Sequence, residues 1–257
     1  AAAEALCEPG AEILYAWPAF SMYPYLPALT GAREIRVPLA AGEVHDLDAM
    51  AAEVTAATQL LLVCNPNNPT GTHIPAAEIA AFCERVPAHV TIVLDEAYVE
   101  FQTDDDPDAT VDLLADFPNL VVLRTFSKCY GLAGLRVGYA IGSSNFRAAV
   151  DAVRQPFSVN ALAQAAGAEA ILHQDDVLAR VEATVVERIR VQEGVADPRL
   201  RRTLTLSMRE NVACGRKTGR RFESLQGLDN AVLRLFASVP VGLAGTLPRL
   251  MGRRMGA

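Results

Sequence analysis

Residues 120–139 read LVVLRTFSKCYGLAGLRVGY, and this stretch decides the fold. Its first residues, 120–123, form an apolar, β-branched run that is typical of a buried strand. Small and hydroxyl-bearing residues follow, with Lys128 just after the run and Arg136 eight positions later. A cation so close to a buried strand end is costly unless a partner or a reaction uses it. The stretch therefore predicts a strand that leads into a chemically used lysine.

Four polar side chains of this stretch could together hold a phosphorylated aldehyde. Thr125 and Ser127 offer two hydroxyls, and Arg136 offers a planar fork that binds phosphate through two hydrogen bonds. Lys128 lies between them and could form a Schiff base with the aldehyde of the same molecule. Pyridoxal 5′-phosphate (PLP) is such a molecule. The alternative is a strand followed by a glycine-rich turn with a solvated lysine, because such turns are common.

Strand-like and helix-like segments alternate along the rest of the first 190 residues. This alternation predicts an α/β fold of three layers, in which a mostly parallel sheet carries helices on both faces. A chain of 257 residues is long enough for one large domain of this kind or for two small ones. Strands are expected at 12–16, 34–37, 59–64, 90–94, 120–123 and 137–141, and helices at 21–31, 46–57, 75–85, 144–154 and 160–190.

Three polar residues, Asn68, Asp95 and Lys128, each follow the end of an expected strand. Ligands of open parallel sheets bind outside the carboxyl ends of the strands, so we expect an active site at this edge. Two of the residues also have plainer interpretations. Asp95 could be a helix cap or a surface acid, and Asn68, within NPNNPTG at 65–71, could belong to a turn without chemistry.

The order of these motifs resembles a known enzyme family. TFSKxxGLAGLRxGY at 125–139 resembles the lysine segment of the class I/II aminotransferases, which belong to PLP fold type I. It is most similar to that of histidinol-phosphate aminotransferase and of relatives acting on aromatic amino acids. NPNNPTG at 65–71 and DEAY at 95–98 match the family pattern upstream. The resemblance covers about residues 3–190.

The resemblance implies a role for each matching residue. Asp95 would pair with the protonated ring nitrogen of PLP, which keeps the ring an electron sink. Tyr98 would contact the phenolic oxygen of the ring, and Asn68 would donate its amide to that oxygen. Phe20, at the end of WPAF, would stack on the ring, where the family also uses tyrosine. Without the resemblance, Phe20 would be expected in the core.

The resemblance also implies a transamination in two halves. Lys128 would hold PLP, and after displacement by an amino donor it would move a proton between the substrate α-carbon and the C4′ carbon. The donor leaves its nitrogen on the cofactor, and a 2-oxo acid collects it. The expected substrates are histidinol phosphate or glutamate and a 2-oxoglutarate-type acid, in histidine biosynthesis, by a cytoplasmic homodimer. Two alternatives stay open: an aromatic amino-acid (phenylalanine) aminotransferase on the same scaffold, and a non-catalytic remnant.

The composition argues against several other functions. A net charge of −7 disfavours a nucleic-acid surface. Five widely spaced cysteines, in no metal-like cluster, fit reduced thiols in a cytosolic protein. No apolar run reaches the roughly 18 residues of a membrane span. The glycines after Lys128 do not form the GxGxxG of a dinucleotide-binding loop.

Both ends of the chain depart from the family pattern. The first ten residues read as the end of a helix, so we expect a truncated chain whose phosphate-gripping turn would lie before Ala1. Residues 191–257 hold 12 Lys and Arg against 5 Asp and Glu, and the strand–helix alternation fades there. We expect residues 1–190 to be a partial PLP-binding large domain. Residues 191–257 would be an atypical basic segment, disordered or frame-disrupted, that replaces a complete C-terminal domain. Arg201 or Arg202 is a candidate for the arginine that binds the substrate carboxylate in the family, although the spacing is wrong.

Overall fold

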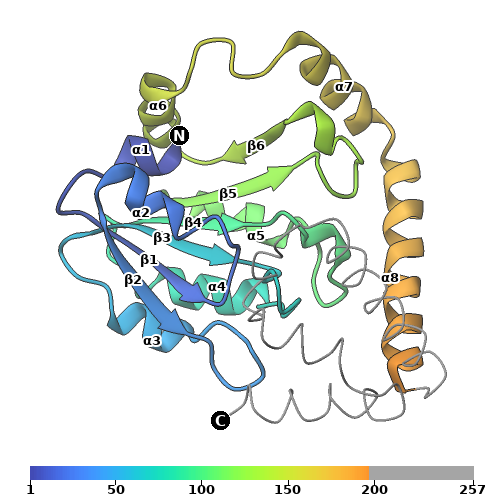
Figure 1. Cartoon of the computed structure of the whole chain (residues 1–257), viewed down its shortest axis with the longest axis horizontal. Coiled ribbons are helices and arrows are strands. Elements are labelled where there is room, and N and C mark those ends of the chain that lie inside the picture. The colour runs from blue at the N-terminus through green and yellow to red at the C-terminus, as the bar shows by residue number, and fades with distance from the viewer. Residues whose placement is uncertain (197–257) are drawn as a thin grey trace, which may run out of the picture. The chain divides into compact units, whose positions relative to one another are not determined.

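The computed structural model describes the backbone of residues 1–196 and the side chains of residues 1–186. Within these residues, six strands form one sheet in the order β2-β1-β3-β4-β5-β6 (Figure 1). Neighbouring strands from β2 to β5 are parallel, and β6 runs antiparallel to β5. The predicted α/β fold with a mostly parallel sheet is therefore confirmed. The strands are β1 (Glu12–Trp17), β2 (Arg33–Pro38), β3 (Thr58–Cys64), β4 (Thr91–Asp95), β5 (Leu120–Thr125) and β6 (Gly138–Ile141).

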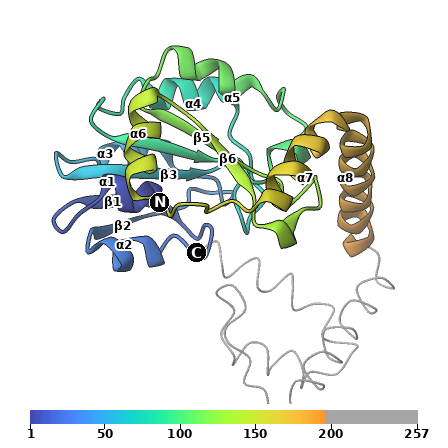
Figure 2. The same cartoon turned by 90° about the horizontal axis from the view of Figure 1, so that it is seen from above.

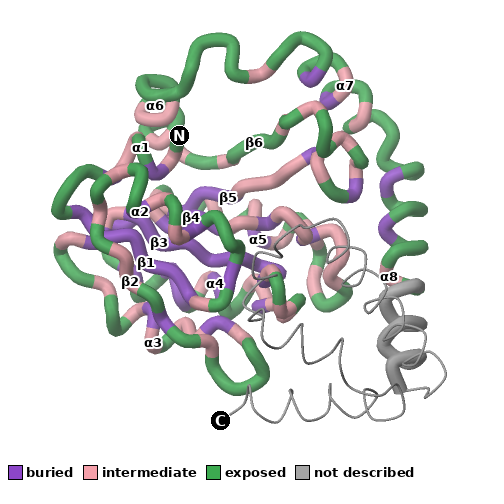
Figure 3. The backbone as a smooth tube through the Cα atoms, in the orientation of Figure 1, coloured by how far each residue is buried: buried purple, intermediate pink, exposed green. Residues whose placement is uncertain are grey.

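Side chains of the central strands alternate between two cores, one on each face of the sheet. In β3, Leu61 and Val63 enter the core that also holds Phe82, whereas Leu62 enters the core that holds Ala3. Each fully buried aliphatic side chain stabilises the fold by roughly 1.5–3 kcal/mol. Because helices cover both faces, the central strands read as nearly continuous apolar runs. Figure 3 shows the resulting buried band through β1 and β3.

The helices lie in two layers on either side of the sheet (Figure 2). The first layer holds α1, α2 and α6, and the second holds α3, α4 and α5. Two helix ends follow the sequence prediction. The Asp46 carboxylate accepts from the Ala49 amide at 2.9 Å and caps α3, and Gly31 ends α2 with a φ of 75°. The α-helices are α1 (Ala2–Leu6), α2 (Tyr25–Thr30), α3 (Leu47–Ala52), α4 (Ala76–Cys83), α5 (Ala109–Asp112), α6 (Ser144–Val153), α7 (Ala161–Leu172) and α8 (Gln174–Ala196). The short 3₁₀ turns are η1 (Val99–Phe101), η2 (Leu113–Ala115) and η3 (Ala133–Leu135).

Helix α3 is shorter than the sequence predicts. It ends at Ala52 rather than near residue 57, because the chain turns back at Thr55 to enter β3. The Thr55 amide donates to the Thr58 hydroxyl at 2.9 Å, and the Thr55 hydroxyl donates to the buried Glu12 carboxylate at 2.8 Å. These local hydrogen bonds offer the backbone an alternative to another helical turn.

The expected helix at 160–190 is two helices, and the expected helix at 21–31 is a turn followed by a short helix. The break between α7 and α8 falls at His173, and Asp175 and Asp176 favour a new helix start directly after it. Helix α2 begins only at Tyr25, after Pro24. A proline is best accommodated at a helix start, which explains why the helix does not extend further back.

Residues 1–182 form one compact unit, and residues 183–257 form a second. The predicted division after residue 190 stays a prediction, because most of the second unit lies outside the described residues. The same holds for the expected character of 191–257 and for Arg201 and Arg202. Among the residues that the structure describes, no helix combines the length and the apolar character that a bilayer crossing requires.

Candidate functional site

The carboxyl ends of β3, β4 and β5 lie side by side at one edge of the sheet, which we call the rim. Cys64 at the end of β3 is paired with Asp95, and Asp95 is paired with Leu123 of β5. Asn68 follows β3 by four residues, and Lys128 follows β5 by three. The structure therefore brings the chain segments that carry Asn68, Asp95 and Lys128 to one edge, as the sequence predicts.

Asp95 ends β4 and faces the layer of α1 and α2. Alternation along β4 puts it on the same face as Val93, which belongs to the core of that layer. The Tyr23 hydroxyl donates to its Oδ2 at 3.0 Å, and the Ala97 amide donates to its Oδ1 at 3.3 Å. Burial raises the pKa of the Asp95 carboxyl, although these two hydrogen bonds and the charge of Lys128 oppose the shift. The site thus contains a desolvated acid whose nearest donors are neutral.

Lys128 lies in the bend that follows β5, and its side chain is exposed. Its Nζ lies over the Tyr98 ring, 4.8 Å from the ring centroid, in a cation–π contact. Its charge also acts on the Asp95 carboxyl. Two elements that are more than 30 residues apart in the sequence therefore place an amine, a phenol and a carboxylate together.

Thr125, Ser127 and Arg136 lie at the end of β5 and in the connection to β6. Thr125 pairs with Gly138, and its hydroxyl accepts from the Ser127 amide at 3.1 Å. Arg136 lies just before β6, has a left-handed φ of 56° and donates from Nη1 to the Ala133 carbonyl at 2.9 Å. A left-handed backbone costs a residue with a side chain about 1–3 kcal/mol, and such strain is concentrated at functional positions. Two hydroxyls and one guanidinium thus come from the same hairpin connection that carries Lys128.

The loops after β3 and β1 are joined beside Asn68 and Phe20. The Asn67 amide donates from Nδ2 to the Pro18 carbonyl at 3.2 Å. Asn65 fixes the base of the NPNNPTG loop through two hydrogen bonds of 2.8 Å with Ile74. Phe20 is 37% exposed and contacts the Tyr23 ring edge-to-face, with 5.8 Å between the ring centroids. Phe20 therefore lies outside the core, contrary to the plainer interpretation.

Sequence reasoning missed the role of Tyr23. Its side chain is 5% exposed, and burial, followed by the Asp95 charge, raises the pKa of its hydroxyl. A tyrosine three positions after Phe20 is the only signal in the sequence. Tyr23 follows β1 and Asp95 ends β4. The two can be expected to meet only once β1 and β4 are known to flank β3, and the order of the strands along the chain does not reveal this.

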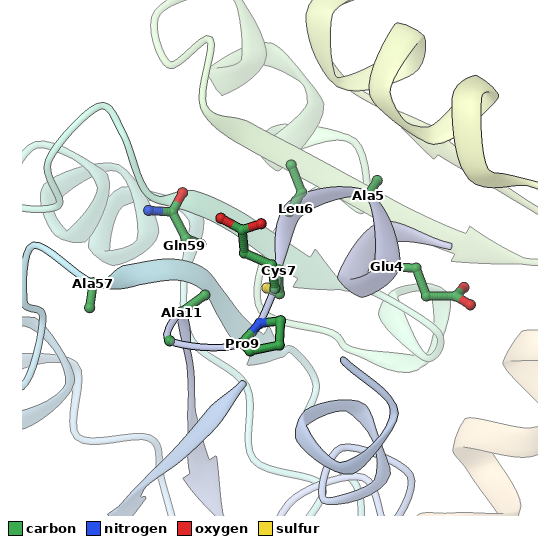
Figure 4. Close-up of a pocket in the computed structure, with 10 residues that line it drawn as sticks. Glu4, Ala5, Leu6, Cys7, Pro9, Ala11, Ala57 and Gln59 are labelled. Atoms are coloured by element: carbon green, nitrogen blue, oxygen red, sulfur yellow. The ribbon is translucent and has the colours of Figure 1, made fainter. Parts of the chain in front are cut away.

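Two further observations concern other parts of the described chain. A pocket of about 490 Å³ lies at the amino ends of β1 and β3, opposite the rim, and is lined by residues 4–11, Ala57 and Gln59 (Figure 4). The side chains drawn there include the exposed Glu4 and the buried Cys7, and none of the rim residues.

Among the described residues, no three His, Cys, Asp or Glu side chains gather as metal ligands. The four described cysteines are all buried free thiols.

Fold and site together define an α/β protein with a lysine-centred site at the carboxyl edge of its sheet. Residues 1–205 match the family model described as "Aminotransferase class I and II", and the chain belongs to this family. Curated relatives include the "Aromatic amino acid aminotransferase" of Streptomyces coelicolor, 48% identical over 75% of this chain and 54% of the relative. The protein of the same name from Thermobifida fusca is 53% identical over 75% of this chain and 53% of the relative. The chain thus spans about half the length of these curated relatives.

Solved structures of the family share the fold. A histidinol-phosphate aminotransferase from Sinorhizobium meliloti, in complex with pyridoxal-5'-phosphate, matches with a TM-score of 0.74 and 26% identity. This match covers 94% of our chain and 72% of that one. The N-succinyldiaminopimelate aminotransferase of Mycobacterium tuberculosis matches with a TM-score of 0.68 and 28% identity, over 77% and 53% of the two chains.

Proposed function

We propose that the chain is the cofactor-binding part of a PLP-dependent aminotransferase. The observation that carries this proposal is the desolvated Asp95 carboxylate at the rim, on which the charge of Lys128 acts. When bound, PLP supplies an electron sink that stabilises negative charge at the α-carbon of an amino acid. The family match and the PLP complex of the Sinorhizobium meliloti relative support this cofactor.

Asp95 fits the ring nitrogen of PLP. Its two oxygens accept one neutral hydrogen bond each from Tyr23 and Ala97, and a carboxylate has room for more. A protonated ring nitrogen would give the desolvated carboxylate a positively charged partner. The negative charge of Asp95 would in turn keep that nitrogen protonated. Tyr23 fixes the direction of the carboxylate.

Lys128 is the residue that would hold PLP covalently and carry the proton. Its amine reaches the Tyr98 ring on the same rim as Asp95. After release by an amino donor, the amine would take the proton from the substrate α-carbon and return it at C4′. Tyr98 and Asn68 would bind the phenolic oxygen of PLP, and Phe20 would cover one face of the ring.

Thr125, Ser127 and Arg136 would bind the phosphate. They come from one hairpin and offer hydroxyl and guanidinium donors, which suit a dianion. With the phosphate held there, Lys128 would be the residue for the aldehyde and Asp95 the residue for the ring nitrogen.

We propose aromatic amino acids as the donor substrates, with a 2-oxo acid of the 2-oxoglutarate type as the acceptor. The curated relatives that are 46–53% identical bear the name aromatic amino acid aminotransferase. The exposed apolar side chains of Phe20 and Met22 beside Tyr23 suit an aromatic ring. Histidinol phosphate, and with it a role in histidine biosynthesis, is the second candidate, favoured by the Sinorhizobium meliloti structure. A homodimer and a cytoplasmic location complete the proposal.

The test uses the fact that the chain has only two lysines, Lys128 and Lys217. PLP is added, the mixture is treated with borohydride, and peptides are mapped by mass spectrometry. We expect a fixed pyridoxyl group on the peptide with Lys128, retained in Lys217→Arg and lost in Lys128→Ala. Labelling of Lys217 alone, or equal labelling of both lysines, would overturn the assignment.

A further inference from the structure

A buried ion pair lies directly behind the rim. Glu96 follows Asp95, and Arg124 precedes Thr125. Because side chains alternate along a strand, Glu96 and Arg124 point to the face opposite Asp95 and Thr125. The Arg124 Nε donates to Glu96 Oε2 at 2.9 Å, and the two side chains are 9% and 0% exposed.

Further contacts lock this pair in place. The Arg124 Nη1 donates to Asp108 Oδ1 at 2.6 Å, and its Nη2 donates to the Pro107 carbonyl. The Thr110 hydroxyl donates to Glu96 Oε1. We call Glu96, Arg124, Asp108 and Thr110 the rim clamp. Burial opposes the charge of Arg124, but its hydrogen bonds to Asp108 and Glu96 outweigh burial and raise its pKa.

The rim clamp lies where the backbone hydrogen bonds between β4 and β5 end. The last β4–β5 pair is Asp95 with Leu123, and the Glu96 amide donates to the Leu123 carbonyl at 2.9 Å. Beyond this point Arg124 and Thr125 pair only with β6. Beyond this point, side chains must therefore set the separation between the segment that follows Asp95 and the segment that carries Lys128. Links between these segments also include the Lys128–Tyr98 contact and a hydrogen bond between Glu100 and Cys129.

Stability alone does not explain such a pair. Burial raises the pKa of Glu96 even though Thr110 and Arg124 oppose the shift, so its charge remains costly. Replacing a buried ion pair by apolar residues of similar size is often neutral for stability, whereas removing one partner is not. We therefore attribute the Glu96–Arg124 pair to its effect on the geometry of the ends of β4 and β5.

We propose that Glu96 and Arg124 are positioning residues, which hold the ends of β4 and β5 so that Asp95 and Lys128 face one and the same cofactor. This inference rests on the proposed function for the identity of the cofactor. The geometric part, that the clamp orders the segments 96–101 and 126–131, stands independently of PLP.

The test replaces both charges at once, in the full chain, as Glu96→Leu/Arg124→Met. The matched control is Glu12→Leu/Arg33→Met, which removes another ion pair with a buried glutamate at the amino edge of the sheet. We expect the clamp variant to melt, without PLP, close to the wild type. Its Kd for PLP should rise about 10- to 100-fold, since misplacing a functional group by about 1 Å weakens activity or binding by this order. The control variant should bind PLP as the wild type does.

Amide hydrogen exchange on the cofactor-free proteins gives a readout that needs no PLP. We expect faster exchange at 96–101 and 126–131 in the clamp variant only. Wild-type exchange and PLP affinity in that variant, or equal losses in the control, would overturn the inference. If the wild type itself takes up no PLP, the proposed function fails, while the exchange rates still decide whether the clamp orders the rim.

A second variant covers the case in which the double replacement does not fold. Arg124→Lys keeps the charge but loses the planar fork, which contacts Glu96, Asp108 and Pro107 together. We expect a folded protein with PLP affinity about 10-fold lower than the wild type. Unchanged affinity in Arg124→Lys would contradict a positioning role.

Discussion

The ionised carboxylate of Asp95 destabilises the cofactor-free protein. Its carboxylate is desolvated, and only hydroxyl and amide donors reach it, with the Lys128 charge nearby. Proteins commonly keep such destabilised groups where function requires them. The same carboxylate that would bind the ring nitrogen thus weakens the fold until that ring is present.

Asp95→Asn should therefore stabilise the cofactor-free protein at neutral pH. The pKa of Asp95 is higher in the folded than in the unfolded chain, so protonation favours folding, and that contribution is lost as pH rises through the folded pKa. We expect the variant to melt roughly 2–4 °C above the wild type at pH 7–8, with the difference shrinking as the pH is lowered through the folded pKa of Asp95. Melting curves across this pH range test the prediction. The control is Asp116→Asn at an exposed position, which should melt like the wild type. A variant less stable than the wild type at pH 8 would contradict the expectation.

The sequence predicts the residues that follow strands but not their supporting contacts. Asp95 comes directly after an apolar run, and Lys128 and Asn68 follow such runs by a few residues, so their place at the carboxyl edge follows from the general rule for parallel sheets. The contacts of Tyr23 with Asp95, of Asn67 with Pro18 and of Glu96 with Arg124 depend on which strands are neighbours. Strand order is a long-range property, and a local pattern of residues does not contain it.

Among the elements, the β5–β6 hairpin decides how closely the groups that we propose for the phosphate approach one another. At Gly138 the antiparallel strand passes so near β5 that an added Cβ would lie 2.8 Å from the Arg124 carbonyl oxygen. This contact involves backbone, which yields less than a flexible side chain. The sequence predicts both strands of this hairpin but not their antiparallel pairing. It also does not predict the end of α3, which depends on the bond of Thr55 to the distant Glu12.

Gly138→Ala should push β6 away from β5 and destabilise the fold by about 1–3 kcal/mol, as overpacking does elsewhere. The matched control is Gly134→Ala, where a Cβ would meet no atom within 4 Å. The free energy of unfolding, from urea titrations, should fall for the first variant and stay near the wild type for the second. Equal stability of the two variants would mean that the hairpin relaxes around the new methyl group.

At the scale of the molecule, the described residues would supply the groups that we propose for the cofactor, and the chain spans about half the length of its curated relatives. The predicted carboxylate-binding candidates Arg201 and Arg202 lie outside the described residues. Substrate choice is therefore a property of the whole chain and must be measured on it.

We expect phenylalanine to convert the PLP-loaded chain to its amino form at least about 10-fold faster than histidinol phosphate does. The reason is that a phosphate dianion needs added basic groups, whereas Phe20 and Met22 already offer apolar surface. Single-turnover absorbance of the cofactor, with Lys128→Ala as the inactive control, measures both rates. Faster conversion by histidinol phosphate would reverse the order of the two candidates. No conversion by any donor would support the non-catalytic remnant.

The antiparallel direction of β6 has a consequence for the order of folding. Thr125, Ser127 and Arg136 are neighbours along the chain, so a short hairpin brings them together with little loop-closure entropy. Asp95 and Asn68 join them only after parallel strands have been connected through crossover segments, which is slower. The half of the rim that the hairpin carries can thus assemble from local contacts, and the half that carries Asp95 and Asn68 is completed last.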